Sequence, residues 1–432
     1  MTRFVALLLS FSICAPIGLA EKRPMSPIDM VEMPRLGDAA LSYDGRYLLY
    51  EISSTNWAEN EKVGRYQLLD VFTGEQLPAP NPEDETVDVR AAVWAPDRNA
   101  FLFLRRPSED ESVQVFQYDV DTQQRQQLTD LDHSVSSIFW GADPSRFYFI
   151  ARAQKSKLVE DQIDADWLIE PYDTPRHREI WTYDLKTRTS EKLVAGEFSI
   201  RDAYAHGAQA IVFVKVPNHT LNASHHGEVV VYDLEADQYS VWTQNDYRES
   251  DPKLSPDGSM IAYIATVNET GDPYYEDKVF VQRRGQAAKR VMGDQAFEAL
   301  DFAWDRAGTG LFILGNTGLR SDLYHYTLET GEVAKISNGA HRVTDWVYDP
   351  DIDTHLARIE TSDSPGDFFF SSQNGAFERL TDVYVEWAKN FELPVQEAVQ
   401  WSARDGSEIE GLLVFPIGYR DGQSYPLVTI TH

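Results

Sequence analysis

Apolar and polar positions along the chain follow one repeated pattern, a short polar turn followed by a run of apolar residues. The clearest copy reads Leu-Ser-Pro-Asp-Gly-Ser-Met-Ile-Ala-Tyr-Ile at residues 254–264. The runs are rich in Val, Ile, Phe and Tyr, which pleated sheets prefer, so each copy predicts a turn and a strand. Seven copies occur, at residues 41–50, 93–104, 140–150, 205–214, 254–264, 304–314 and 348–359.

Most copies are followed by a second hairpin of the same kind, for example at residues 68–75 and 116–122. Two hairpins give four short antiparallel strands per repeat. The turn aspartates Asp44, Asp97 and Asp143 are 53 and 46 residues apart, which is typical of propeller blades. The pattern therefore predicts an all-β fold, a seven-bladed β-propeller. Two stacked β-sandwiches would account less well for the regular spacing.

The turn residues of the clearest copy have a local physical explanation. Pro256 fixes φ at the second turn position, and the Asp257 side chain can bond to its own backbone. Gly258 can adopt the left-handed conformation that such a turn needs. These choices predict a tight turn immediately before the strand.

The first twenty residues have a different character. Arg3 precedes an apolar run at residues 4–15, and Gly18-Leu19-Ala20 offers small residues where a signal peptidase cuts. The run is shorter than the roughly 20 residues that span a bilayer. We therefore expect a cleaved secretory signal rather than an uncleaved anchor. The mature protein would be exported, periplasmic or extracellular, with no membrane segment.

Composition narrows the possible functions. The chain has 69 acidic and 39 basic residues and a net charge of −30, the wrong sign for general nucleic-acid binding. A mean hydropathy of −0.41 excludes a polytopic membrane protein. Hydrophobic residues at 42% exclude a disordered chain. The single cysteine, Cys14, lies in the expected signal, which leaves the mature chain no disulfide, zinc finger or cysteine nucleophile.

A polar and acidic segment, residues 155–178, interrupts the third repeat. Insertions between scaffold strands often carry functional residues. Glu170, Tyr172, Arg176 and His177 are candidates to contact the amino end or the carboxylate of a peptide. The alternative interpretation is an ordinary irregular surface loop.

The sequence predicts no cofactor and no metal. His219, His225 and His226 lie close together, but no second group of ligands has a matching spacing, so a solvated loop accounts for them. No glycine-rich phosphate loop follows a strand. No Gly-x-Ser-x-Gly nucleophile motif occurs in the 432 residues.

The pattern changes after residue 390. Residues 395–402 and 409–416 alternate like two half-buried strands joined by a turn. Residues 426–431 form a continuous apolar run, typical of a strand buried on both faces of an α/β sheet. Because further elements normally follow such a strand, we expect the chain to be truncated inside this second domain.

These features occur in a characteristic order. The signal and the propeller are followed by Asp405-Gly406-x-x-Ile409-x-Gly411, then by Pro426-Leu427-Val428 and His432. In this combination the sequence resembles the prolyl oligopeptidase family of serine peptidases, particularly its acylaminoacyl-peptidase and dipeptidyl-peptidase-like branch. The resemblance implies that His432 begins a His-Gly-Gly-Pro motif that helps to form the oxyanion hole. It also implies a Ser/Asp/His triad beyond His432.

The resemblance completes the expected domain order. Residues 1–20 form the signal peptide, residues 21–35 an N-terminal segment and residues 36–390 the propeller. Residues 391–432 form the first strands of a truncated α/β-hydrolase domain, the peptidase domain.

Two functions of different kinds fit this organisation. The resemblance implies the N-terminal propeller portion of an exported serine peptidase that hydrolyses short peptides, with the propeller gating access. This chain alone would be inactive. The alternative is a non-enzymatic periplasmic scaffold similar to the translocation protein TolB, and a sugar-processing or lectin-type propeller is a third class. Residues 395–432 favour the peptidase, because a scaffold has no need of them.

Overall fold

The structure is a computed structural model with nearly all of its regular structure in β-strands. It describes residues 22–80, 89–108, 111–152, 177–218, 226–245, 247–266, 277–293, 297–339, 341–372 and 376–430. The expected signal peptide, residues 1–20, lies outside the described residues.

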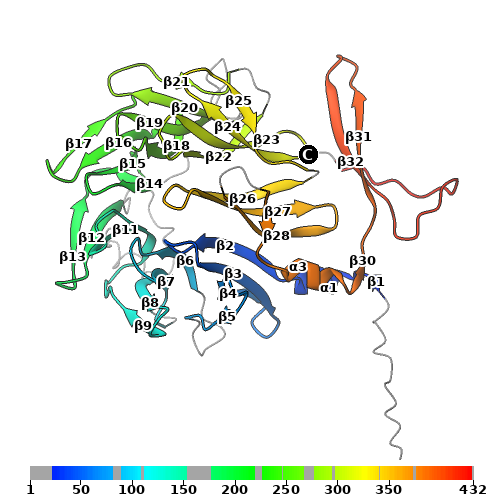
Figure 1. Cartoon of the computed structure of the whole chain (residues 1–432), viewed down its shortest axis with the longest axis horizontal. Coiled ribbons are helices and arrows are strands. Elements are labelled where there is room, and N and C mark those ends of the chain that lie inside the picture. Colours follow the sequence, from blue (N-terminus) through cyan, green and yellow to red (C-terminus); the bar gives the residue numbers. More distant parts are fainter. Residues whose placement is uncertain are drawn as a thin grey trace, which may run out of the picture.

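Seven successive meanders of four antiparallel strands follow one another around a ring (Figure 1). Five are separate sheets, and the last two are joined by one parallel pair, Ser321 with Arg342. These sheets are consistent with propeller blades, and we number them 1 to 7 in chain order. The strands are β2 (Arg35–Leu41), β3 (Tyr47–Asn56), β4 (Glu61–Asp70) and β5 (Gln76–Leu77); β6 (Val89–Trp94), β7 (Ala100–Arg105), β8 (Gln114–Asp119) and β9 (Gln124–Gln127); β10 (Val135–Trp140), β11 (Arg146–Arg152), β12 (Arg178–Asp184) and β13 (Thr189–Val194); β14 (Ser199–His206), β15 (Ala210–Val216), β16 (Glu228–Asp233) and β17 (Gln238–Val241); β18 (Arg248–Leu254), β19 (Met260–Thr266), β20 (Asp277–Arg283) and β21 (Lys289–Arg290); β22 (Glu298–Trp304), β23 (Gly310–Asn316), β24 (Ser321–Thr327) and β25 (Val333–Lys335); and β26 (Arg342–Asp349), β27 (Thr354–Thr361), β28 (Ser364–Ser372) and β29 (Glu378–Arg379).

Each of the seven predicted turns joins the first and second strands of one blade. In blade 5, Gly258 has a φ of +69°, as the turn requires. Ser255 Oγ donates to Asp257 Oδ1 (2.6 Å) and accepts from the Met260 backbone N–H (3.0 Å). Hydrogen bonds from Ser255 and Ser259 lower the pKa of Asp257 to about 2. The aspartate therefore remains a charged acceptor that fixes the turn.

The core is divided among the blade interfaces. In the described part of the chain, seven hydrophobic clusters are each shared by two neighbouring blades. The cluster between blades 1 and 2 contains the fully buried side chains of Tyr66, Phe101 and Phe103. Apolar burial is the main favourable term in folding, so each blade is stabilised chiefly by its two neighbours.

The ring closes without exchanging a strand, because all four strands of each blade come from one continuous segment. We call the contact between blades 7 and 1 the closing seam. There the Leu36 backbone N–H donates to Tyr384 Oη (3.2 Å), and Arg358 Nη1 donates to the Leu36 carbonyl (3.3 Å). The rings of Tyr50 and Phe368 lie 6.0 Å apart. Side chains rather than a shared sheet hold the seam.

A buried side-chain arrangement recurs in blades 2, 6 and 7, and we call it the hydroxyl clasp. In blade 2, Thr129 Oγ1 accepts from the Val115 backbone N–H and donates to Gln114 Oε1, both at 2.8 Å. The hydroxyl thus ties the end of the fourth strand to the start of the third. The corresponding pairs are Ser337 with Asp322 in blade 6 and Thr381 with Asp367 in blade 7.

Replacing Thr129 by valine should lower the free energy of unfolding by about 1–3 kcal/mol. The change keeps the shape, leaves the buried Val115 N–H without its partner and removes one of the two hydrogen bonds that Gln114 Oε1 accepts, the other coming from the Leu131 backbone N–H. Denaturant unfolding measures the effect. Thr187→Val is the matched control, because the Thr187 hydroxyl is exposed and bonds to Thr189, and it should change stability by less than about 0.5 kcal/mol. Equal effects of the two changes would show that the clasp contributes nothing.

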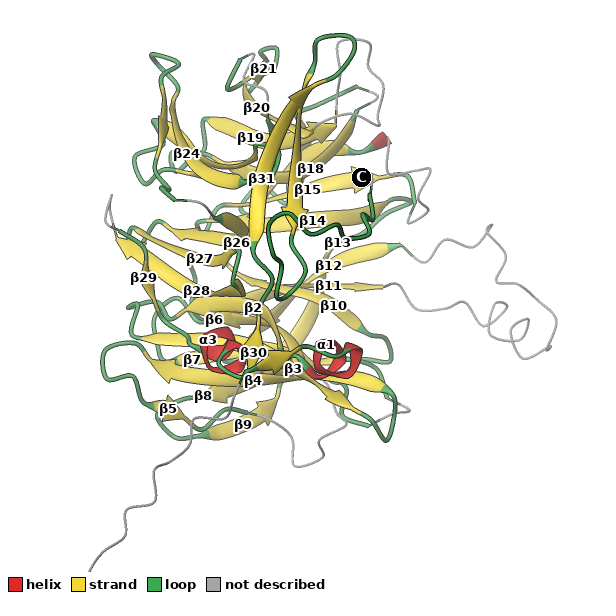
Figure 2. Cartoon of the chain, turned by 90° about the vertical axis from the view of Figure 1, so that its right-hand side faces the viewer, coloured by secondary structure: helices red, strands yellow, loops and turns green. Residues whose placement is uncertain are grey.

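Two short helices and a hairpin lie outside the blades, on the side facing the viewer in Figure 2. Helix α1 (Pro27–Glu32) begins with a capping box between Ser26 and Asp29. Helix α3 (Val383–Ala388) follows blade 7. Strand β1 (Arg23–Pro24) pairs in parallel with β30 (Phe391–Glu392), which joins the N-terminal segment to the chain after the propeller.

The predicted hairpin after residue 390 is present as β31 (Gln396–Ser402) and β32 (Glu408–Val414). The predicted strand at residues 426–431 is wrong, because residues 426–430 are irregular. Leu427, Val428 and Ile430 are 78%, 80% and 88% exposed. A strand needs neighbours for its backbone hydrogen bonds, and the described residues supply none here. The described chain therefore shows a two-stranded antiparallel hairpin, with no α/β-hydrolase part evident.

Candidate functional site: the central channel and a lateral groove

The first strands of all seven blades line a cavity of about 1180 Å³, the central channel. In every blade, the pairing between the first and second strands shifts register near the start of the first strand. At three of the shifts a non-glycine residue has a positive φ: Ala91 (53°), Asp202 (48°) and Asp251 (49°). Bulges bend a strand and redirect its side chains. The repeated bulge thereby shapes the wall of the channel.

Polar contacts across blade boundaries fix the channel wall. Tyr204 Oη of blade 4 donates to Asp251 Oδ1 of blade 5 at 2.5 Å. Burial, reinforced by the charge of Asp251, raises the pKa of Tyr204 well above its ordinary value, so the phenol stays a donor. Lys253 of blade 5 donates to Asp301 Oδ1 of blade 6 at 3.1 Å. Side-chain contacts thus link blade 4 to blade 5 and blade 5 to blade 6 along the wall.

Carboxylates outnumber cations on the channel wall. The six acidic residues are Asp38, Asp251, Asp301, Asp305, Asp345 and Asp351, and the three basic ones are Lys253, Arg306 and Arg358. Arg358 is neutralised by Asp345, with Nε 2.7 Å from Oδ2. A channel with one sign of charge in excess attracts counter-charged solutes and repels like-charged ones. The channel therefore favours neutral and cationic molecules over anions.

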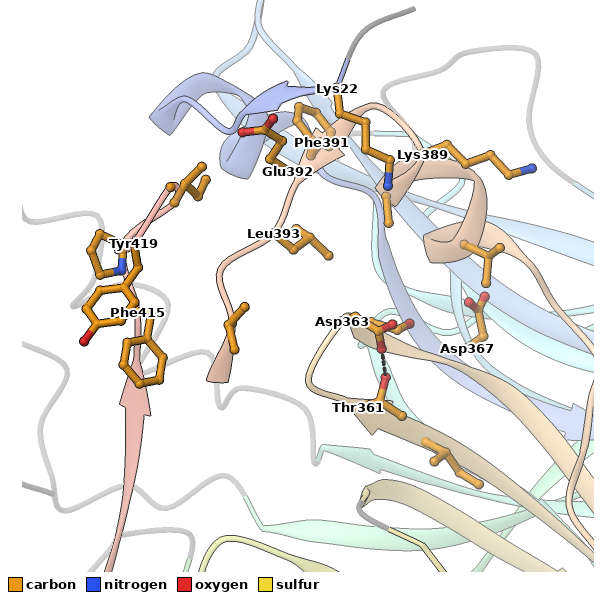
Figure 3. Close-up of a pocket in the computed structure, with 18 of the residues that line it drawn as sticks. Lys22, Thr361, Asp363, Asp367, Lys389, Phe391, Glu392, Leu393, Phe415 and Tyr419 are labelled. Atoms are coloured by element: carbon orange, nitrogen blue, oxygen red, sulfur yellow. Dashed lines mark hydrogen bonds between the residues drawn. The ribbon is translucent and has the colours of Figure 1, made fainter. Parts of the chain in front are cut away.

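A second cavity of about 1010 Å³ lies between blade 7 and the chain after α3, and we call it the lateral groove (Figure 3). Two hydrogen bonds between described residues tie the hairpin on its far side to blades 6 and 7. Gln396 Nε2 donates to the Ser362 carbonyl (3.0 Å), and the Leu319 backbone N–H donates to Glu410 Oε2 (3.3 Å). Residues far apart in the sequence meet in this groove: Lys22 of the N-terminal segment and residues between β27 and Tyr419.

Most of the predicted contact residues fall where the structure gives no description. Glu170, Tyr172, Arg176 and His432 lie outside the described residues. His177 is described, directly before β12 of blade 3, where it is half-buried and its Nδ1 has no hydrogen-bond partner. Their predicted roles stay predictions. Within the described ranges, no three His, Cys, Asp or Glu side chains are grouped so as to hold a metal ion.

Sequence analysis missed both cavities. One signal was present: the Leu-Thr-Asp triplets at residues 128–130 and 380–382 repeat the same hydroxyl after the fourth strand. That repetition would have marked the clasps.

The helices of the described ranges are all too short or too polar to cross a membrane.

The described fold is that of a β-propeller of the kind found in peptidases, as comparison with known proteins shows. No family model matches the chain. An uncharacterized peptidase, YuxL of Bacillus subtilis, is 18% identical over 95% of this chain and 66% of its own length. Dipeptidyl-peptidase 5 of Porphyromonas gingivalis is 26% identical over 41% of this chain and 26% of its own length. The acylaminoacyl peptidase of Pyrococcus horikoshii superimposes with a TM-score of 0.68 at 16% identity, over 92% of this chain and 60% of that one.

The propeller is thus related to those of the acylaminoacyl peptidase, dipeptidyl-peptidase 5 and prolyl oligopeptidase family, and the 432 residues cover mostly the propeller portion. This confirms the resemblance seen in the sequence. The chain spans no more than 66% of the length of these relatives.

Proposed function

We propose that the chain is the N-terminal propeller portion of an exported serine peptidase that hydrolyses short peptides. A catalytic domain would follow in the same polypeptide, and the propeller would gate access to it. The observation that carries the proposal is the relationship to peptidase propellers over nearly the whole chain. The channel and the hairpin after the propeller, which exposes Trp401, Leu412 and Val414, support it.

The proposed gating rests on size and charge. A cavity of about 1180 Å³ is of the order that holds small ligands or short peptides. A folded domain of 100 residues has a radius of gyration of about 13 Å and does not fit. The acidic wall would add a preference for peptides without excess negative charge. Export is supported by the apolar run at residues 4–15 and the small residues at positions 18 and 20.

One experiment tests the function. The coding frame is read past codon 432, and the complete product is isolated from the source cells. The 432-residue chain is produced separately for comparison. A serine-directed fluorophosphonate should label the complete product and leave the 432-residue chain unlabelled. The complete product should begin at Glu21 after export and cleave a short peptide. The same peptide built into a folded protein should be cleaved at least 100-fold more slowly.

The matched control replaces the serine of the downstream Gly-x-Ser-x-Gly motif by alanine, which should abolish both labelling and hydrolysis. A frame without such a motif would refute the peptidase. Equal cleavage of the free peptide and the folded protein would refute gating alone.

A further inference from the structure

Four Asp-Gly pairs occur in the chain, at residues 44–45, 257–258, 405–406 and 421–422, and the structure describes all of them. Such a pair is chemically labile, because glycine has no side chain to shield its backbone nitrogen from the carboxyl group before it. All four aspartates are exposed. Exposure therefore does not distinguish the pairs, and a difference between them must come from the hydrogen bonds of each carboxyl and each glycine nitrogen.

Three of the pairs lie in turns between two antiparallel strands. The backbone N–H groups of Gly45, Gly258 and Gly406 donate to the carbonyl three residues earlier, at 2.8, 2.7 and 3.0 Å. The aspartate of each pair accepts, through Oδ1, the N–H two residues later, at 3.1, 3.0 and 3.0 Å. The nitrogen and the carboxyl of these pairs therefore have separate partners, and the flanking strands hold both groups in place.

The pair at residues 421–422 is arranged differently. The Gly422 backbone N–H donates to Oδ1 of Asp421 itself, at 2.9 Å. The nitrogen thus lies beside the carboxyl group, and Oδ1 is one covalent bond away from Cγ. The pair belongs to an irregular stretch, residues 415–430, that follows the last strand, β32. Groups held in contact react faster than groups held apart, so this pair combines the contact with a backbone that no strand restrains.

We propose that Asp421-Gly422 is a site of spontaneous aspartate isomerisation in the folded protein. The Gly422 nitrogen bonds to Cγ of Asp421 and gives up its proton. The Cγ–OH bond of the protonated carboxyl breaks, and the hydroxyl leaves with that proton as water, which closes a five-membered succinimide ring. Water then adds to one of the two ring carbonyls. Addition at Cγ restores aspartate, and addition at the main-chain carbon gives isoaspartate. The reaction consumes nothing but water.

Isomerisation changes the loop that borders the lateral groove. It adds one carbon to the main chain between Arg420 and Gly422, inside the turn that the Gln423 N–H closes on the Arg420 carbonyl (3.3 Å). The Arg420 N–H also donates to Tyr425 Oη (3.0 Å), and the Tyr425 ring lies 5.3 Å from that of Tyr419. Tyr419 lines the groove (Figure 3). The reaction therefore alters one wall of the groove as the protein ages. It needs no catalytic activity, so its test is independent of the proposed peptidase function.

Asp405 is the matched control, because residues 404–406 and 420–422 are the same tripeptide, Arg-Asp-Gly. The 432-residue chain is aged in its folded state and, in parallel, unfolded in urea. Peptide mapping then measures isoaspartate at each pair. In the folded chain Asp421 should isomerise at least about fivefold faster than Asp405, because only its carboxyl contacts the nitrogen that attacks it. In urea the two rates should converge, because only the local sequence then acts.

A variant checks the assignment. Asp421→Glu should abolish the signal at this pair and leave the rates at the other three unchanged, because a glutamyl carboxyl would have to close a larger ring. The Asn-Gly pairs at residues 338–339 and 374–375 also yield isoaspartate but gain mass, so they are counted separately. Equal rates at Asp421 and Asp405 in the folded chain would overturn the proposal. A difference that persists in urea would also overturn it, since the cause would then be the sequence rather than the fold.

Discussion

Replacing Phe101 by alanine should lower the free energy of unfolding by about 3–5 kcal/mol. Phe101 is fully buried between blades 1 and 2. Its ring lies 5.1 Å from that of Trp94, 5.5 Å from Tyr118 and 6.3 Å from Tyr66. The change removes the transfer free energy of the ring and leaves a cavity that the sheets cannot close. Urea denaturation of the 432-residue chain measures the loss.

Phe72→Ala is the matched control, because it removes the same side chain from a turn where Phe72 is 76% exposed. It should change the stability by less than about 0.5 kcal/mol. Similar losses in the two variants would contradict the division of the core among the blade interfaces.

Acidification should destabilise the protein through His355. The side chain is 5% exposed, and its Nδ1 accepts from Trp346 Nε1 at 3.2 Å. Burial lowers its pKa from 6.5 to about 4, against the smaller opposing effect of Asp353. The folded state therefore binds the proton less readily than the unfolded state. The free energy of unfolding that neutral His355 contributes is therefore fully present above pH 6.5. It falls by about 3 kcal/mol as the pH drops toward 4, because each unit of difference between the two pKa values corresponds to about 1.36 kcal/mol.

The test compares the unfolding free energy of the parent chain with that of His355→Asn between pH 7 and pH 4.5. Asparagine offers an oxygen to Trp346 but does not titrate, so the variant should lose less stability on acidification. Burial also lowers the pKa values of His133, His206 and His341, and these contributions remain in both proteins. Parallel pH profiles would show that His355 does not contribute.

The repeated turns and strands were predictable because their causes are local. A turn such as residues 254–258 encodes its own geometry through its proline, aspartate and glycine. The strand predicted at residues 426–431 failed because strand formation depends on neighbouring chain, which an apolar run does not specify. The bulges at Ala91 and Asp251 were also missed, since they place ordinary residues at positive φ without a glycine to mark them.

The lateral groove could not be predicted for a different reason. Its walls combine Asp367, Phe391 and Phe415, and only the folded chain after the propeller brings them together. A sequence pattern does not specify contacts between segments that lie so far apart in the chain.

The closing seam sets the order in which the protein can be completed during synthesis. Six of the blade interfaces join segments that emerge from the ribosome one after the other. The seam joins Leu36 to Tyr384, 348 residues later. Until that late segment appears, the apolar edge of blade 1, with Leu48, Tyr50 and Leu69, has no neighbour to cover it. The nascent chain thus carries an open hydrophobic edge through most of its translation, and this edge is where a chaperone would bind and where premature association between chains would begin.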